Sequence, residues 1–151
     1  MQIIDVFVEN PARLPFQGIN KKFIKQLASA IMELKQLDNA GICVILTDNE
    51  YIRGINNRYR GKDSATDVIS FAYREEPFPS DGSLTEQLGD IYISLEKVHE
   101  QALLYNVSVK DEFRRLLVHG ILHLLGYDHE GSSGKRRLME EEEESILSSL
   151  Q

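Results

Sequence analysis

Apolar and polar residues follow two periods along the chain, and these periods predict a mixture of strands and helices. Alternating or continuous apolar runs predict strands at 3–8, 41–47, 67–72 and 88–94. Helical spacing predicts five helices. The first covers 19–37, the second runs from a Thr47–Glu50 capping box to about 59, and the third runs from a Ser94 cap to about 105. The fourth begins after Ser108, and the fifth lies near the C-terminus. A long loop between the last two strands is indicated by Pro77, Pro79, Ser80, Asp81 and Gly82.

Four strands and about five helices without an internal repeat are typical of an α+β domain built on one small sheet. The 151 residues, of which 42% are hydrophobic, suit a single domain with one core that covers residues 1–151. The order of the strands in the sheet does not follow from these patterns.

The helix after Ser108 has the clearest period and carries two histidines. Its apolar residues form one stripe: Phe113, Leu116, Leu117, Gly120, Ile121, Leu124 and Leu125. His119 and His123 are one turn apart on the same face, at the edge of this stripe. We expect both imidazoles to line a cleft and to reach one ion.

Gly126 ends this helix and indicates a reversal of the chain. A left-handed conformation at this glycine brings His129 back towards the other two histidines. Three imidazoles without a fourth protein ligand are typical of a catalytic zinc site with an open coordination position. The spacing therefore predicts one Zn²⁺ ion held by His119, His123 and His129. The alternative is two helix-surface histidines and an unrelated loop histidine, which leaves the spacing of His129 unexplained.

The same spacing, H-x-x-x-H-x-x-G-x-x-H, occurs in metzincin proteases, which have a glutamate general base directly after the first histidine. Gly120 stands at that position here. A protease of that type would keep its metal and lack its proton acceptor, so this residue weakens the protease interpretation.

The formal charge of −7 argues against a general nucleic-acid-binding protein. Five of the acids form the run Glu140 to Glu144, and without them the chain carries −2. We interpret this run as the solvated face of a final helix that packs through Met139, Ile146 and Leu147. A local track for RNA phosphates requires basic residues to converge on one face, and the clusters available are Arg53, Arg58, Arg60, Lys62, Arg114, Arg115 and Lys135 to Arg137.

Two features of the sequence indicate the cellular compartment. Cys43 is the only cysteine and lies in an apolar run, so a disulfide within the chain is excluded and a buried thiol is expected. The N-terminus has no basic segment followed by an apolar one, and no stretch has the length of a bilayer span. We expect a cytoplasmic protein without a membrane partner.

The chain resembles a known family. The eleven residues from His119 to His129 are similar to the signature of the YbeY family of bacterial endoribonucleases, also called rRNA maturation factors. The likeness continues in Y-R-G-K-D at 59–63, T-D-V-I-S-F at 66–71 and G-D-I at 89–91, and the order and spacing fit from about 42 to 147. Ala72 departs from the family, which often has proline there.

The resemblance implies a mixed sheet covered by helices and a metal-dependent endoribonuclease specific for single-stranded RNA. It further implies a role in ribosomal RNA processing, with maturation of the 3′ end of the small-subunit rRNA, and in ribosome quality control. The partners implied are rRNA and the ribosome or its proteins, and no DNA is expected. Arg60 becomes the candidate catalytic arginine in the cleft, with Arg58 and Lys62 as candidate RNA-binding residues.

In the mechanism that we expect from this resemblance, zinc lowers the pKa of a bound water or polarises a phosphate oxygen, and Arg60 neutralises charge on the phosphate. Asp128 either orients an imidazole or is an ordinary turn residue. The general base stays open between a metal-bound hydroxide, Asp128 and Glu130. His99 is interpreted as a packed histidine, and structural hydrogen bonds are expected for Asp67 and Asp90.

Two other functions share these observations. A zinc-dependent hydrolase of another bond, such as a peptide, predicts a narrow cleft with a carboxylate near the open metal position. A non-catalytic ribosome assembly factor with a structural metal predicts a fourth protein ligand.

Overall fold

Four strands form one mixed sheet in the order β1-β2-β4-β3. The computed structural model describes residues 1–9, 14–75 and 85–150. β1 (Ile3–Val8), β2 (Ala40–Thr47) and β4 (Glu86–Ser94) are parallel neighbours, whereas β3 (Val68–Ala72) runs antiparallel to β4 at the edge. This arrangement confirms the α+β class and supplies the strand order that the sequence patterns left open. The loop expected around Pro77 to Gly82 lies outside the described residues.

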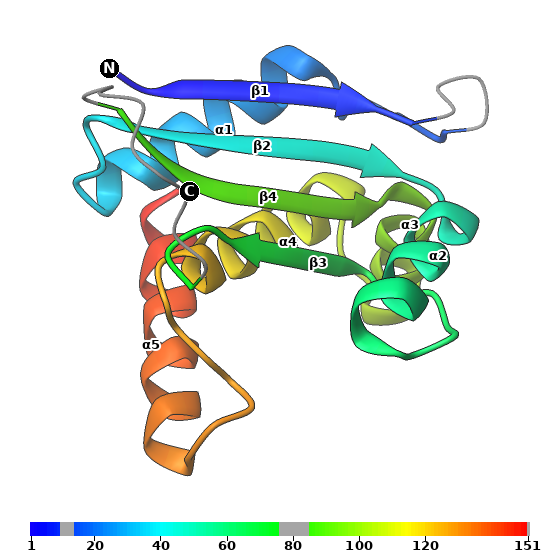
Figure 1. Cartoon of the computed structure of the whole chain (residues 1–151). Coiled ribbons are helices and arrows are strands. Elements are labelled where there is room, and N and C mark those ends of the chain that lie inside the picture. The colour runs from blue at the N-terminus through cyan, green and yellow to red at the C-terminus, as the bar shows by residue number, and fades with distance from the viewer. Residues whose placement is uncertain (10–13, 76–84, 151) are drawn as a thin grey trace.

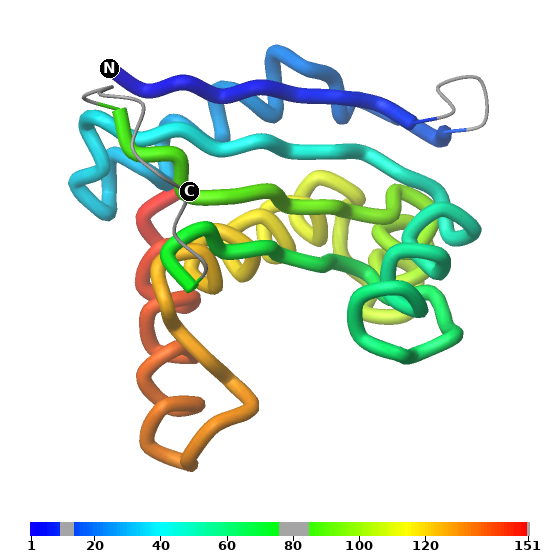
Figure 2. Tube along the Cα trace, viewed as in Figure 1, coloured from blue at the N-terminus to red at the C-terminus, as the bar shows by residue number. Residues whose placement is uncertain are grey.

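Five helices accompany the sheet: α1 (Lys21–Leu34), α2 (Asn49–Arg60), α3 (Leu95–Tyr105), α4 (Val109–Leu124) and α5 (Ser133–Ser149). In Figure 1, α1 and α4 lie on one side of the sheet, α2 and α3 stand at one end of it, and α5 extends away from its lower edge. The Cα trace in Figure 2 follows the chain from α4 through one connecting segment into α5. Among the described residues, none of the helices combines the length and apolar composition that crossing a bilayer requires.

The core lies between β2, β4 and the helices α1 and α4. Alternate residues of β2 point into it, namely Ile42, Val44 and Leu46, and from β4 it receives Ile91 and Ile93. Helix α4 is buried more completely than one stripe predicts, because Val118 and Leu122 are buried as well as every stripe residue except Leu125, which is half-buried at the C-cap. This central helix therefore places its histidines on a rigid element.

The helix starts show one error in the sequence interpretation. Asp48, not Thr47, caps α2 and accepts a hydrogen bond from the backbone of Tyr51 at 2.8 Å. Thr47 is instead the buried last residue of β2, and its hydroxyl donates to the carbonyl of Ile93 at 3.3 Å. Ser94 and Ser108 cap α3 and α4 as predicted.

Candidate metal centre and its cavity

Helix α4 presents His119 and His123 from a backbone that is pressed against the sheet. A side chain at Gly120 would bring its Cβ to 2.8 Å from Cγ2 of Ile91, so only glycine lets the helix approach this closely. The hydroxyl of Ser70 on β3 also donates to the carbonyl of Gly120 at 3.3 Å. The two histidines beside this contact are half-buried at the edge of the packed face, as expected.

The turn after α4 brings the third histidine back. Gly126 has φ of 98°, in the left-handed region, and its N–H donates to the carbonyl of His123 at 3.0 Å. The N–H of Tyr127 donates to the carbonyl of Leu122 at 3.1 Å, and this pair of bonds forms a Schellman motif. The motif reverses the chain, so that His129 lies against the other two imidazoles.

The three imidazoles form a compact cluster. One nitrogen from each of His119, His123 and His129 lies within 4.8 Å of the others. Nε2 of His123 and Nδ1 of His129 are 3.2 Å apart. Two nitrogen ligands of a tetrahedral Zn²⁺ ion are separated by about 3.3–3.4 Å, given Zn–N bonds of about 2.0–2.1 Å. The cluster therefore has the dimensions of a site that can bind a metal ion.

A fourth residue, Glu143 on α5, holds one of these histidines. Nδ1 of His119 lies 2.6 Å from Oε1 of Glu143, and each side chain is 19% exposed. A carboxylate at Nδ1 accepts a hydrogen bond from that nitrogen, which leaves Nε2 of His119 available as a ligand. This arrangement of carboxylate and histidine is common behind protein-bound zinc ions.

Glu143 corrects the interpretation of the acidic run as a solvated face. Glu142 is also half-buried and accepts a hydrogen bond from Lys35 at 3.1 Å, whereas other acids of the run are exposed. The sequence did contain a signal, because Glu143 is four residues after Met139 and three before Ile146, both buried on one face. A carboxylate on the packed face of a helix needs a partner.

The environment keeps His123 neutral. Burial lowers the pKa of His123 to about 4, with further contributions from the nearby His119 and His129 imidazoles and from Arg60. A neutral imidazole is the form that binds a metal ion. At neutral pH this residue therefore needs no deprotonation before it can act as a ligand.

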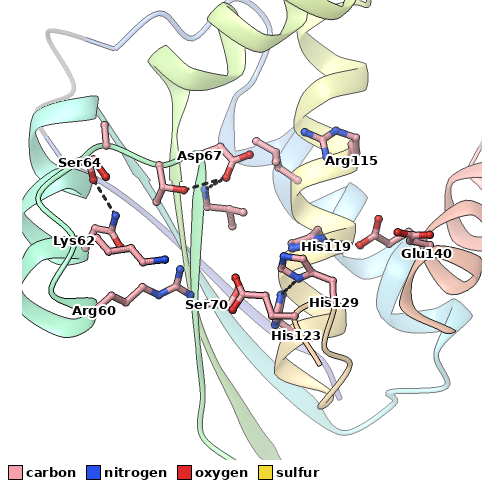
Figure 3. A pocket seen from close by; sticks show the side chains of 17 residues that line it. Arg60, Lys62, Ser64, Asp67, Ser70, Arg115, His119, His123, His129 and Glu140 are labelled. Atoms are coloured by element: carbon pink, nitrogen blue, oxygen red, sulfur yellow. Dashed lines mark hydrogen bonds and ion pairs between the residues drawn. The ribbon is translucent and has the colours of Figure 1, made fainter. Parts of the chain in front are cut away.

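The histidine cluster opens into a polar cavity of about 600 Å³ (Figure 3). Its walls come from α2 and the segment after it, β3, α4, α5 and the segment before α5. The lining residues are Asn56, Arg60, Lys62, Ser64, Ala65, Thr66, Asp67, Val68, Ser70, Arg115, Leu116, His119, His123, His129, Glu130, Glu140 and Glu143.

Arg60 and Lys62 enter this cavity from the side opposite the histidines (Figure 3). Arg60 is the last residue of α2, and this end of the helix is anchored where Tyr59 packs edge-on against Phe71, with ring centres 5.2 Å apart. The buried Asn56 side chain donates to the carbonyl of Ser64 at 2.9 Å and fixes the segment that carries Lys62. The fold thus brings the arginine of the Y-R-G-K-D segment to the histidines.

Other basic candidates lie elsewhere. Arg58 is exposed and is not among the residues that line the cavity, so its RNA-binding role stays a prediction. Arg53 forms a bidentate ion pair with Asp63 at 2.8 and 3.2 Å. The basic residues in and around the Y-R-G-K-D segment therefore point in different directions, and two of them, Arg60 and Lys62, reach the cavity.

The acidic residues considered as candidates differ in their contacts. The carboxylate of Asp128 accepts the backbone N–H of Glu130 at 2.8 Å, which is the contact of a turn residue. The side chain of Glu130 lines the cavity. Asp90 accepts a hydrogen bond from the hydroxyl of Tyr73 at 2.9 Å, as the structural interpretation expected. His99 lies 2.8 Å from the carbonyl of Pro15 and outside the cluster.

A charged network forms another wall of the cavity; the structural hydrogen bonds of Asp67 were expected, whereas its link to Glu112 and Arg115 was not. Glu112 is 2% exposed and accepts two hydrogen bonds from Arg115, at 2.8 and 2.7 Å. Gln101 donates to Glu112 and also to Asp67, the latter at 3.2 Å. Asp67 in turn accepts the N–H of Val68 at 2.7 Å, so this network joins α3 and α4 to the start of β3.

Comparison with known proteins adds independent findings. The family described as "Endoribonuclease YbeY" matches residues 9–151. A protein of that name from Fusobacterium nucleatum is 56% identical over 109 residues, which are 72% of this chain and 66% of that protein, slightly under two thirds of its length. Another of that name, from a Sulfurihydrogenibium species, is 43% identical over 132 residues, 87% of this chain and 84% of that protein.

The fold is also found among solved structures. The solution structure of a Thermotoga maritima protein superimposes with a TM-score of 0.62 and 28% sequence identity. The superposition covers 96% of this chain and 87% of that one.

Proposed function

The chain belongs to the YbeY endoribonuclease family, and on that premise we propose that it is a metal-dependent endoribonuclease that cleaves single-stranded RNA. The observation that carries the proposal is that three imidazoles and Arg60, which lie on separate elements, line one cavity. The imidazoles suit a metal ion and the arginine suits a phosphate, so the two halves of a phosphodiesterase site are close together.

His119, His123 and His129 would hold the ion, and Glu143 would keep His119 in the required orientation. We propose Zn²⁺, because three neutral imidazoles suit zinc and provide none of the oxygen ligands that Mg²⁺ or Ca²⁺ prefer. When bound, such an ion supplies Lewis acidity towards a phosphate oxygen or a water molecule.

Arg60 and Lys62 would bind and orient the scissile phosphate from the opposite wall. The guanidinium of Arg60 presents paired N–H donors to phosphate oxygens and stabilises the charge that builds up on them during displacement. Of the two acids considered as the general base, Glu130 lines this cavity and Asp128 does not, so we propose Glu130 as the proton acceptor.

The charge of the cavity walls supports a role for a metal in RNA binding. Three cationic side chains line the cavity, Arg60, Lys62 and Arg115, against four carboxylates, Asp67, Glu130, Glu140 and Glu143. A polyanion such as RNA gains little binding free energy from walls whose positive and negative charges nearly cancel. A divalent cation would make the cavity net positive, so we expect RNA affinity to fall when metal is removed.

Peptide hydrolysis fits the structure less well. The position of the metzincin general base is Gly120, where even a Cβ would lie 2.8 Å from Ile91. A glutamate at this position would be forced into the sheet and away from the cavity. The cavity walls supply an arginine and a lysine for phosphates, which a peptide does not need.

The relatives named Endoribonuclease YbeY support RNA as the substrate class. We propose that this substrate is ribosomal RNA in the cytoplasm, with the ribosome or its proteins as partners. Maturation of the small-subunit rRNA 3′ end and ribosome quality control are the specific processes proposed.

The decisive experiment compares Arg60→Ala with the wild type on a single-stranded RNA, the same sequence as a duplex, and the same sequence as DNA. We expect the variant to keep zinc and its thermal unfolding temperature while its cleavage rate falls by about 10²–10³-fold. Arg74→Ala is the matched control, because Arg74 is a surface arginine paired with Glu86 at 2.8 Å and does not line the cavity. Cleavage by Arg60→Ala at the wild-type rate would contradict the proposal, as would peptide hydrolysis with RNA left intact.

A further inference from the structure

Arg115 lies one helical turn before His119 and lines the same cavity. Residues four apart on a helix share a face, with Cβ atoms about 5–6 Å apart. Figure 3 shows Arg115 at one end of the site, with the histidines farther along α4 and Arg60 and Lys62 on the opposite wall. The cavity therefore contains a cationic group at a position distinct from that of Arg60.

Buried contacts hold the guanidinium of Arg115 in one orientation. Nε and Nη2 donate to the two oxygens of Glu112, whose side chain is 2% exposed, while the side chain of Arg115 is 40% exposed. The ring of Tyr105 lies 5.9 Å from the guanidinium carbon. Glu112 is itself fixed by Gln101, which also donates to Asp67. The arginine is thus oriented before any ligand arrives.

The pairing leaves donors for a ligand. A guanidinium carries five N–H groups, and two of them are used on Glu112. The remaining donors, on Nη1 and Nη2, form the other edge of a planar fork, which matches the oxygens of a phosphate. Glu112 offsets the charge of the arginine, so hydrogen bonding contributes more here than long-range attraction. Such a group recognises a phosphate at a defined place.

We propose that Arg115, oriented by Glu112, is a binding subsite for a second phosphate of the substrate strand. This subsite would hold a phosphate neighbouring the one at the histidines and Arg60, so that the strand runs along α4. The inference rests on the proposed function for its substrate. It adds a requirement for length: the best substrate carries at least two phosphates.

The test uses oligouridines with one to four internucleotide phosphates and the zinc-loaded protein. For wild type, we expect kcat/KM to rise when a second phosphate is added. Arg115→Met should lose this gain, by about 10–100-fold, because a hydrogen-bonded charged contact is removed. The gain is measured within each protein, as the ratio of kcat/KM for the substrate with two phosphates to kcat/KM for the substrate with one. Equal length dependence in variant and wild type would overturn the subsite.

The neighbouring arginine provides a matched control. Arg114 forms the same i,i+3 ion pair, with Asp111 at 2.8 Å, but its guanidinium lies over Phe23 and it does not line the cavity. Arg114→Met should therefore show the wild-type dependence on length. If both variants lose the gain equally, the effect is one of general surface charge and the subsite is wrong.

Two further variants guard against loss of folding, since Arg115→Met leaves the buried carboxylate of Glu112 without its charged partner. Arg115→Lys keeps the charge and the contact with Glu112 but removes the second edge of the fork. The double variant Glu112→Gln with Arg115→Met removes both charges together. Both should fold, as measured by thermal unfolding, and both should lose the length-dependent gain. Retention of that gain in either folded variant would refute the proposal.

Binding separates this inference from the proposed function. Fluorescence anisotropy with 2′-O-methyl oligouridines of the same lengths measures affinity without cleavage. If the wild type cleaves no RNA but Arg115→Met still abolishes the length-dependent affinity, the function is wrong and the subsite stands. If the wild type cleaves RNA but its affinity and its rate are both independent of length, the subsite is wrong and the function stands.

Discussion

Glu143 offers the sharpest test of how the histidine cluster is held. Its carboxylate lies 2.6 Å from Nδ1 of His119, and both side chains are 19% exposed, so solvent weakens the contact only in part. A hydrogen bond with a charged partner contributes about 1.5–3 kcal/mol, and loss of such a partner behind a metal-binding histidine costs about 10–100-fold in metal affinity. We expect Glu143→Ala to raise the Kd for Zn²⁺ by about 10–100-fold. Glu143→Gln, which retains an acceptor oxygen, should cause a smaller loss.

The assay is competition for Zn²⁺ against a chromophoric chelator, with thermal unfolding of the metal-free proteins measured in parallel. Glu140→Gln is the control, because Glu140 also lines the cavity and its loss removes the same charge. Long-range ¹H–¹⁵N spectra of the metal-free protein should show the proton of His119 on Nδ1 in the wild type and a mixture of tautomers in Glu143→Ala. An unchanged Kd in Glu143→Ala, or an equal loss in Glu140→Gln, would refute this reasoning.

Three predictions concern residues around the site and in the sheet. Gly126→Ala should lower the free energy of unfolding in urea by about 1–2 kcal/mol, because an alanine is strained at a φ of 98°, and Gly126→Asn should lower it less. Equal stability of the two variants would contradict the left-handed conformation at this position. Gly120→Ala should cost about 1–3 kcal/mol through overpacking against Ile91, and a thermal unfolding temperature equal to that of the wild type would show that the helix can move away. Cys43 is half-buried, not fully buried as expected from the sequence. This partial burial, helped by the carboxylates of Asp90 and Asp5, raises the pKa of its thiol to about 11, so at pH 8 it should react with iodoacetamide about 100-fold more slowly than a free thiol; a rate equal to that of a model thiol would contradict this pKa.

The histidine cluster was predictable because its geometry is local. His119 and His123 are related by one helical turn, and Gly126 with its left-handed backbone brings back a residue only three positions away. Helix periodicity and the conformational freedom of glycine are sufficient for such a short segment. The capping error at Thr47 has a local cause too, since threonine and aspartate both cap helices and only the end of β2 decides between them.

Residues that act across the fold were not predictable in the same way. Glu143 is 24 positions from His119, and their contact depends on how α5 packs against α4. The pair of Glu112 and Arg115 has ordinary i,i+3 spacing, and nothing in that spacing shows that the carboxylate is buried or that the arginine faces a cavity. The strand order was not predictable for the same reason, because tertiary packing and not the local sequence places β3 antiparallel beside β4.

Helix α5 has a consequence for the cooperativity of the fold. Its buried residues are Met139 and Ile146, and it extends away from the sheet in Figure 1. Few buried apolar groups imply a low free energy for local opening, so we expect α5 to open as a separate unit while the sheet stays folded. Each such opening would separate Glu143 from His119. Amide hydrogens of α5 should therefore exchange with solvent faster than those of α4, and a bound ion that draws the two helices together should slow the exchange in α5 more than in β2.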